Sequence, residues 1–203
     1  MNKIREICEA RLRLLQWDQA SSNRMWDKRA DEFSRLSSKA DQDGYMAFFQ
    51  SCADLSGATV MDVGCGAGRY LKRLLDAGAK AEGLEPSGGM IARAQEYLGE
   101  FGYSNIQINQ VAFQDYEVDH RVDYAFVANC PISSDYGSYL KLLNLATKGI
   151  FIGTWIERQD IYYEKVSRAL GVEPVRRTSY DPFYLFNIFV ADGYLPKFET
   201  SEK

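Results

Sequence analysis

The chain is organised around a glycine-dense stretch that follows a short apolar run. Residues 58–70 read A-T-V-M-D-V-G-C-G-A-G-R-Y, with glycine at every second position from 64 to 68. The run Thr59–Val63 is typical of a buried parallel strand, and residues 70–75 have a helical pattern. Glycine permits positive φ and lets a ligand approach the main chain closely. The stretch therefore predicts a strand, a ligand-binding turn and a helix.

A carboxylate two residues before the first glycine restricts the ligand. Asp62 puts negative charge where a phosphate would otherwise lie, so the expected ligand carries an amine or hydroxyl groups. The dinucleotide pattern G-x-G-x-x-G would need glycine at position 69, which is Arg69. A generic nucleotide-binding turn, or glycines that serve only a tight bend, are the alternatives.

The motif D-V-G-C-G-A-G resembles the first motif of class I S-adenosylmethionine-dependent methyltransferases, an acidic residue, one residue, and then G-x-G-x-G. The resemblance implies an α/β fold with a doubly wound, mostly parallel Rossmann-like sheet flanked by helices. It also implies S-adenosylmethionine as the cofactor. The cofactor contacts expected in this motif are Asp62, Gly64, Cys65, Gly66 and Gly68.

A second acid follows at the end of the next expected strand, residues 80–85. Glu85 lies seventeen residues after Gly68, where a crossover helix returns the chain to the neighbouring strand. A carboxylate there can accept hydrogen bonds from both ribose hydroxyls; the alternative is a surface glutamate. Pro86 and Met90 belong to a segment, E-P-S-x-x-M, that resembles the family's second motif. Met90 is expected to lie against adenine or simply to pack.

The third expected strand, residues 105–110, is followed by a departure from the family pattern. The family usually has an acid here that faces the adenine amino group, but this chain has Val111. The backbone of Ala112 and Phe113 would have to replace that contact, or else the side chain of Gln114 or Asp115.

Asn129 is expected at the carboxyl end of the fourth strand, beside the transferable methyl group. The sequence N-C-P at 129–131 resembles the N-P-P-Y-type motif of amino-group methyltransferases. The middle residue differs, however, and no aromatic residue follows the proline. Asn129 is therefore interpreted as a wall of the site or as a residue that orients the acceptor.

The first 50 residues are expected to form a helical cap or lid, and residues 51–203 the S-adenosylmethionine-binding domain. An amphipathic helix is predicted over residues 3–20, with an interruption at residues 21–23. The pattern W-D-x-R-A-x-x-F from Trp26 to Phe33 resembles a segment that folds over the cofactor in many small-molecule methyltransferases. Trp26 is therefore a candidate cofactor contact, although a plain packing stripe is an equal alternative.

The carboxyl-terminal part predicts an aromatic helix over residues 180–190. Phe183, Phe186 and Val190 fall on one face, which indicates either core packing or the wall of an acceptor pocket. Only seven residues follow Pro196, too few for the last antiparallel strand pair of the family's seven-stranded sheet. The sheet is therefore expected to be short, unless the chain is truncated.

The amino-acid composition and net charge of the chain exclude several classes of protein. The chain has 203 residues, 46% of them hydrophobic, which is typical of one globular domain. A net charge of −4 makes a nucleic-acid partner unexpected, and no apolar run is long enough to span a membrane. The four scattered cysteines predict reduced thiols and a cytoplasmic location. The single histidine, His120, is expected on a surface loop, and no metal site is predicted.

The expected function is methyl transfer from S-adenosylmethionine to an oxygen, nitrogen or sulfur of a small molecule by in-line displacement. The sequence identifies no catalytic residue, although Asp181, Glu157 and Tyr180 are candidate bases. Alternatives are a non-catalytic domain that binds S-adenosylmethionine or S-adenosylhomocysteine, an RNA or protein methyltransferase, and an NAD-dependent oxidoreductase. The sequence does not distinguish a monomer from a homodimer.

Overall fold

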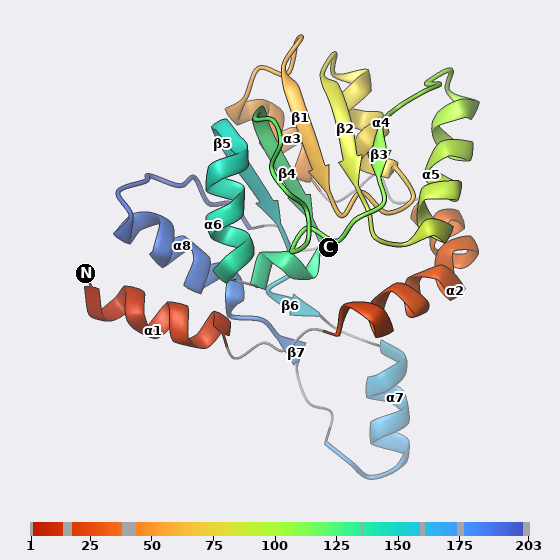
Figure 1. Ribbon diagram of the computed structural model, residues 1–203. Helices are drawn as coiled ribbons and strands as arrows, with labels where there is room; N and C mark the ends of the chain where they lie inside the picture. Colours follow the sequence, from red (N-terminus) through yellow and green to blue (C-terminus); the bar gives the residue numbers. More distant parts are fainter. Residues whose placement is uncertain are drawn as a thin grey trace.

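The computed structural model describes residues 2–13, 18–37, 44–134, 136–158, 161–173 and 177–200. At its centre lies a five-stranded parallel sheet with the strand order β3-β2-β1-β4-β5 (Figure 1). Its strands are β1 (Thr59–Val63), β2 (Lys80–Leu84), β3 (Ile108–Asn109), β4 (Val122–Ala128) and β5 (Ala146–Gly153). The Rossmann-like α/β prediction is confirmed, with a third strand shorter than expected. Among the described residues no strand extends the sheet beyond β5.

The order of the strands positions the site. The chain moves outward from β1 to β3 and then returns to β4 on the other side of β1. In open sheets of this kind, ligands bind outside the carboxyl ends of the strands where the direction of winding reverses. That point lies here between β1 and β4, directly after Val63 and Ala128.

Helices cover both faces of the sheet (Figure 1). On one face, Leu71 and Leu74 of α4 pack with Phe126 and Phe151, whose rings stack 4.6 Å apart. On the other face, Leu142 belongs to a separate apolar cluster with residues of β1 and β4. The helices around the sheet are α3 (Tyr45–Cys52), α4 (Arg69–Asp76), α5 (Gly88–Glu100), η1 (Pro131–Ser134) and α6 (Tyr136–Leu145).

The remaining elements are α1 (Asn2–Arg13), α2 (Gln19–Ser37), β6 (Glu157–Arg158), α7 (Ile161–Ala169), β7 (Arg177–Thr178) and α8 (Asp181–Ala191). The predicted interruption at residues 21–23 is wrong, because α2 runs through it. Asp18 precedes the helix, and its side chain accepts a hydrogen bond from the Ser21 amide at 3.1 Å. The two serines therefore lie in a capped first turn rather than in a break. Residues 14–17 lie outside the described part of the chain.

The predicted buried face of α8 is also wrong. Leu185 and Ile188 are buried, whereas Phe183 and Val190 are each 39% exposed. The reason is that α8 packs against α1 and α6, so the residues that face those helices form the core. Phe183 instead contacts Phe198 of the carboxyl-terminal segment.

Across the described residues, none of the helices combines the length and apolar character needed to cross a bilayer. No disulfide joins Cys8, Cys52, Cys65 or Cys130, all of which lie in the described part of the chain.

His120 predicts a pH dependence of stability. Its Nε2 lies 2.5 Å from Glu82 Oε1 and its Nδ1 lies 2.7 Å from Asp119 Oδ1. These two carboxylates, Glu82 first, raise the pKa of His120 above its usual 6.5. A raised pKa stabilises the fold below about pH 6.5, and this contribution is lost as the pH rises through the folded-state pKa.

The His120→Gln variant should therefore be less stable than the wild type at pH 5.5, and the difference should shrink as the pH rises. Urea unfolding at a series of pH values measures it. A stability difference that does not change with pH would contradict the ion-pair explanation.

Candidate functional site

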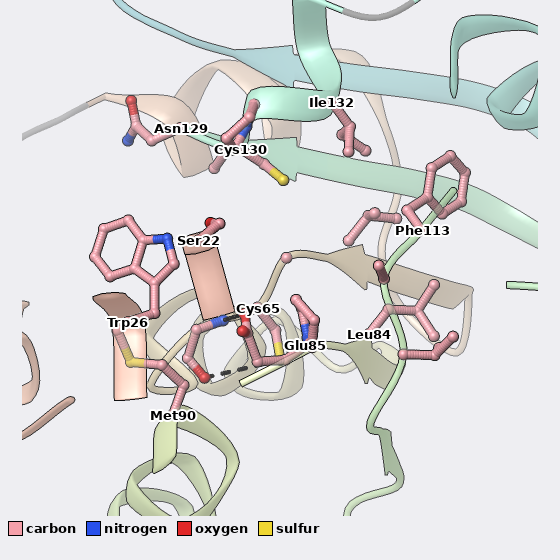
Figure 2. A pocket seen from close by; sticks show the side chains of 18 of the residues that line it. Ser22, Trp26, Cys65, Leu84, Glu85, Met90, Phe113, Asn129, Cys130 and Ile132 are labelled. Carbon is pink, nitrogen blue, oxygen red and sulfur yellow. Dashed lines mark hydrogen bonds between the residues drawn. The ribbon is translucent and has the colours of Figure 1, made fainter. Parts of the chain in front are cut away.

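A cavity lies at the carboxyl ends of β1, β2 and β4, where the topology predicts a site (Figure 2). We call it the central cavity. Its walls come from the glycine-rich turn after β1, the segments that follow β2, β3 and β4, and one face of α2. Its lining residues are Gln19, Ser22, Trp26, Val63, Gly64, Cys65, Gly66, Ala67, Arg69, Tyr70, Leu84, Glu85, Pro86, Met90, Val111, Ala112, Phe113, Gln114, Ala128, Asn129, Cys130, Pro131 and Ile132.

Glu85 is the acidic residue of this wall and is 6% exposed. Its Oε2 accepts a hydrogen bond from the Gly66 amide at 3.0 Å, and its Oε1 accepts one from the Ser87 amide at 2.9 Å. Burial raises the pKa of Glu85, and these two amides oppose that shift. A carboxylate has about four lone-pair sites, so each oxygen can accept a further hydrogen bond from a ligand.

The three glycines of the turn all have positive φ, but they serve different purposes. A Cβ at Gly64 would lie 2.6 Å from Cys130 Sγ, and one at Gly68 would lie 3.1 Å from Ala94 Cβ of α5. A Cβ at Gly66 would meet no atom of the described residues within 4 Å. Gly64 and Gly68 therefore permit close packing, whereas Gly66 leaves space beside its backbone.

Asp62 lies behind this turn and does not line the central cavity. The side chain is 1% exposed, and its Oδ2 has no hydrogen-bond partner among the described residues. Burial, together with the neighbouring charge of Glu85, raises the pKa of Asp62 to about 8, and Arg69 opposes this shift. The structure therefore places Asp62 beneath the turn, with its carboxyl group buried in the protein and not facing the central cavity.

The segment after β4 forms a further wall of the cavity, next to the glycine-rich turn. Asn129 has a left-handed backbone conformation with φ of 52°, and its backbone amide donates a hydrogen bond to the Gly153 carbonyl at 2.7 Å. The Tyr45 hydroxyl donates to Asn129 Oδ1 at 3.3 Å. In Figure 2 the Asn129 amide and the Trp26 indole lie at one end of the cavity, with Phe113 and Ile132 at the other.

Helix α2 closes one side of the cavity and is tied to the start of α5. Asp27 Oδ1 accepts hydrogen bonds from the Ser87 hydroxyl at 2.5 Å and from the Gly89 amide at 3.1 Å. These bonds lower the pKa of Asp27. Ser87 also caps α5, because its hydroxyl accepts a hydrogen bond from the Met90 amide. Further along α2 and α5, an ion pair joins Arg93 to Asp31 at a nitrogen–oxygen distance of 2.7 Å.

The segment after β3 forms the end wall. Ala112 and Phe113 are both nearly fully buried and line the cavity with Val111 and Gln114. Within the described part of the chain, the amides of residues 112–114 donate to no protein acceptor. Amides of buried residues are rarely without a partner in folded proteins, so the Ala112 and Phe113 amides can donate to a ligand, whereas Gln114 is exposed.

The structure brings most of the residues predicted from the sequence together around the cavity. Asp62 and Gly68 do not line it. Those that line it are Trp26, Gly64, Cys65, Gly66, Glu85, Pro86, Met90, Ala112, Phe113 and Asn129. The candidate bases Asp181, Glu157 and Tyr180 lie elsewhere.

Sequence reasoning did not assign Ser22 or Cys130 to the site. Ser22 lies one helical turn before Trp26, so the correct helix start would have placed both on one face. Cys130 follows Asn129 directly, and its Sγ lies close to Gly64.

Comparisons with known proteins agree with this arrangement. A family model described as "Methyltransferase domain" matches residues 60–143. A relative from Anoxybacillus flavithermus, named an uncharacterized methyltransferase, is 28% identical over 130 residues, which are 63% of this chain and 61% of that protein. A relative of the same name from Geobacillus thermodenitrificans is 40% identical over 57 residues, 28% of this chain and 26% of that protein. The matches thus span less than two thirds of either relative.

Solved structures share the fold. The X-ray structure of YjhP from E. coli has a TM-score of 0.57 and 22% identity, over 81% of this chain and 71% of that chain. Magnesium protoporphyrin IX methyltransferase from Synechocystis PCC 6803, crystallised with S-adenosylhomocysteine, has a TM-score of 0.52 and 16% identity, over 85% of this chain and 77% of that chain. Residues 60–143 thus match a methyltransferase domain, and the glycine-rich motif and the strand order of the sheet agree with that match.

Proposed function

We propose that the central cavity binds S-adenosylmethionine and that the protein transfers its methyl group to a small-molecule nucleophile. One observation carries the proposal: Glu85, a buried carboxylate with remaining acceptor capacity, is held by the Gly66 and Ser87 amides at the floor of the cavity. A carboxylate that can accept further hydrogen bonds is the group required to bind two adjacent ribose hydroxyls.

The residues around Glu85 fit the rest of the cofactor. The open space at Gly66 gives room for a ligand against the loop backbone. Phe113 and Ile132 offer an apolar slot on one side of Glu85, which suits the adenine ring. Trp26 and Asn129 lie at the other end, which suits the methionine part and the methyl group.

Residues 1–50 are proposed as the cap of the site. Trp26 and Ser22 of α2 contribute to the cavity wall, and Asp27 holds α2 against the start of α5. A cofactor enclosed in this way would be shielded from water on the side of α2. We therefore assign α2 the role of a lid over the cofactor.

When bound, S-adenosylmethionine supplies a methyl group on a sulfonium that is already a good leaving group. The part played by the chain is alignment, and holding two reactants in attack geometry can supply roughly 7–11 kcal/mol of a barrier. Asn129 is fixed by its backbone bond to Gly153 and by Tyr45, so it presents a rigid polar group beside the site of transfer. We assign it the role of orienting the acceptor and propose no general base.

A small-molecule acceptor is supported by charge and by the named neighbours. The net charge of −4 disfavours a nucleic acid. One structural neighbour is a magnesium protoporphyrin IX methyltransferase, and another, at a TM-score of 0.50 and 18% identity, is a phosphoethanolamine N-methyltransferase from Haemonchus contortus. Both names describe small acceptors of different chemistry, so they support the class of acceptor and not its identity.

Thermal unfolding with different ligands tests the cofactor assignment. A ligand present at 100 times its Kd stabilises the folded state by about 2.7 kcal/mol, which raises the Tm of a chain of this size by roughly 5–10 °C. We expect this rise with S-adenosylhomocysteine and none with NAD. A rise with NAD alone would replace the proposal with an oxidoreductase.

Methyl transfer is tested separately from binding. The protein is incubated with S-adenosylmethionine labelled in its methyl group and with a fractionated metabolite extract. A labelled small molecule that forms with the wild type and not with Glu85→Ala supports the enzyme. Binding of S-adenosylhomocysteine without any labelled product in small-molecule, RNA or protein fractions would favour a non-catalytic binding domain.

A further inference from the structure

Lys141 lies outside the central cavity, and its ammonium group donates three hydrogen bonds to the protein backbone. It lies on α6 and reaches the segment that follows β3. Its Nζ donates to the backbone carbonyls of Phe113 at 2.9 Å, Gln114 at 2.6 Å and Tyr116 at 2.9 Å. An ammonium carries three hydrogens, so each finds one carbonyl. The charge also lies 5.5 Å from the centre of the Phe113 ring.

The segment that Lys141 contacts is a single tight turn. The amides of Asp115 and Tyr116 both donate to the Ala112 carbonyl, at 2.9 and 3.0 Å. A helical turn that does not continue leaves the carbonyls at its carboxyl end without intrahelical partners, and these carbonyls carry partial negative charge. The Phe113 carbonyl also accepts from the Tyr116 amide at 3.3 Å. Lys141 supplies the donor for the Gln114 and Tyr116 carbonyls and a compensating positive charge for all three. The shape of the turn therefore depends on a side chain from a different element.

The same turn forms the end wall of the central cavity. Ala112, Phe113 and Gln114 line the cavity, and their amides donate to no acceptor in the described residues. Val111 supplies no polar side chain at the position where an acid was expected. Recognition of a nucleobase at this wall would therefore use main-chain groups. The positions of these groups depend on the conformation of the turn.

Resting on the proposed function, we propose that Lys141 is the positioning residue for recognition of the cofactor's base. By holding the turn at residues 112–116, it sets where the backbone meets the adenine ring. Its removal should weaken binding of the adenine-containing ligand and also reduce discrimination between bases. A lysine that only stabilised the fold would change neither the discrimination nor the balance of KM and kcat.

The test compares Lys141→Met with the wild type, since methionine keeps most of the length but has no charge and no donor. Calorimetry measures the Kd of S-adenosylhomocysteine and of its analogue with hypoxanthine in place of adenine. We expect the affinity for S-adenosylhomocysteine to fall roughly 10-fold to 100-fold and the ratio of the two affinities to move toward one. In the labelled-methyl assay, KM for S-adenosylmethionine should rise while kcat at saturation changes little.

Two further variants make the result specific. Lys141→Arg retains charge and donors in a planar arrangement, so it should restore part of the affinity and of the discrimination. Lys148→Met is the matched control, because Lys148 is an exposed lysine paired with Asp123 at the opposite end of the sheet. Its affinities should equal those of the wild type.

Unchanged affinity and unchanged base discrimination in Lys141→Met would overturn the proposal, even if the variant were less stable. If Lys141→Met does not fold, Lys141→Gln is measured in the same assays, with the same outcomes decisive. Failure of the wild type to bind S-adenosylhomocysteine would instead refute the proposed function, so the two failures are distinguishable.

Discussion

Replacing Glu85 with alanine should lower the affinity for S-adenosylhomocysteine by at least about 100-fold. Hydrogen bonds to a charged group contribute about 1.5–3 kcal/mol each, and we propose that Glu85 makes two to the ribose. The substitution also leaves the Gly66 and Ser87 amides without their acceptor. Calorimetry with S-adenosylhomocysteine measures the effect. Wild-type affinity in Glu85→Ala would contradict the assignment of the ribose site.

The isosteric variant Glu85→Gln sharpens this prediction. Both carboxylate oxygens accept from backbone amides, so the glutamine NH₂ group would have to face one of those N–H donors. We therefore expect an affinity loss for Glu85→Gln that is smaller than that for Glu85→Ala but clearly measurable. The control is Glu82→Gln on β2, the strand that Glu85 follows, because the Glu82 carboxylate contacts His120 and does not line the cavity. Its affinity should remain within about twofold of the wild type.

The sequence predicted Glu85 because its position follows from topology. A strand that ends in an acid, one crossover helix after a glycine-rich turn, must meet that turn at the same edge of a parallel sheet. The spacing alone could not show that Glu85 would accept hydrogen bonds from Gly66 and Ser87. That depends on the dihedral angles of two turns, which only the folded structure supplies.

Asp62 shows the opposite case. Its position in the motif suggested direct contact with the ligand, but alternation along β1 places it on the same side of the sheet as Val60, beneath the turn. The motif therefore predicted the residue and the location of the site, while the direction of the side chain depended on how α4 packs over the strand. The cofactor role of Asp62 stays a prediction.

The sequence predictions of helix boundaries and of buried helix faces were wrong where tertiary contacts determine them. Ser21 and Ser22 have weak helix propensity, and Asp18 makes them the first turn of α2. In α8 almost every residue is apolar, so periodicity gave no unique face, and packing against α1 selected Leu185 and Ile188. The role of Lys141 left no signal in the sequence, because Lys141 and the carbonyls that it contacts are 25 to 28 residues apart.

Gly64→Ala should destabilise the fold by about 2–5 kcal/mol, with two physical causes. The φ of +75° disfavours any residue with a Cβ, at about 1–2 kcal/mol. The added Cβ would also lie 2.6 Å from Cys130 Sγ, and forcing atoms into a packed interior costs about 1–3 kcal/mol. Urea unfolding measures the sum. Gly102→Ala is the matched control, because Gly102 has φ of +81° and no atom within 4 Å of its would-be Cβ.

A second substitution separates the two causes. Cys130→Ala removes the sulfur, so the remaining contact is the Cys130 Cβ at 3.2 Å. Gly64→Ala should therefore be less destabilising in the Cys130→Ala background than in the wild type, and the coupling between the two sites should be about 1 kcal/mol or more. The strain from φ remains in both backgrounds and should match that of Gly102→Ala. Additive effects of the two substitutions would show that the turn yields to the new methyl group, and that Cys130 does not require glycine at position 64.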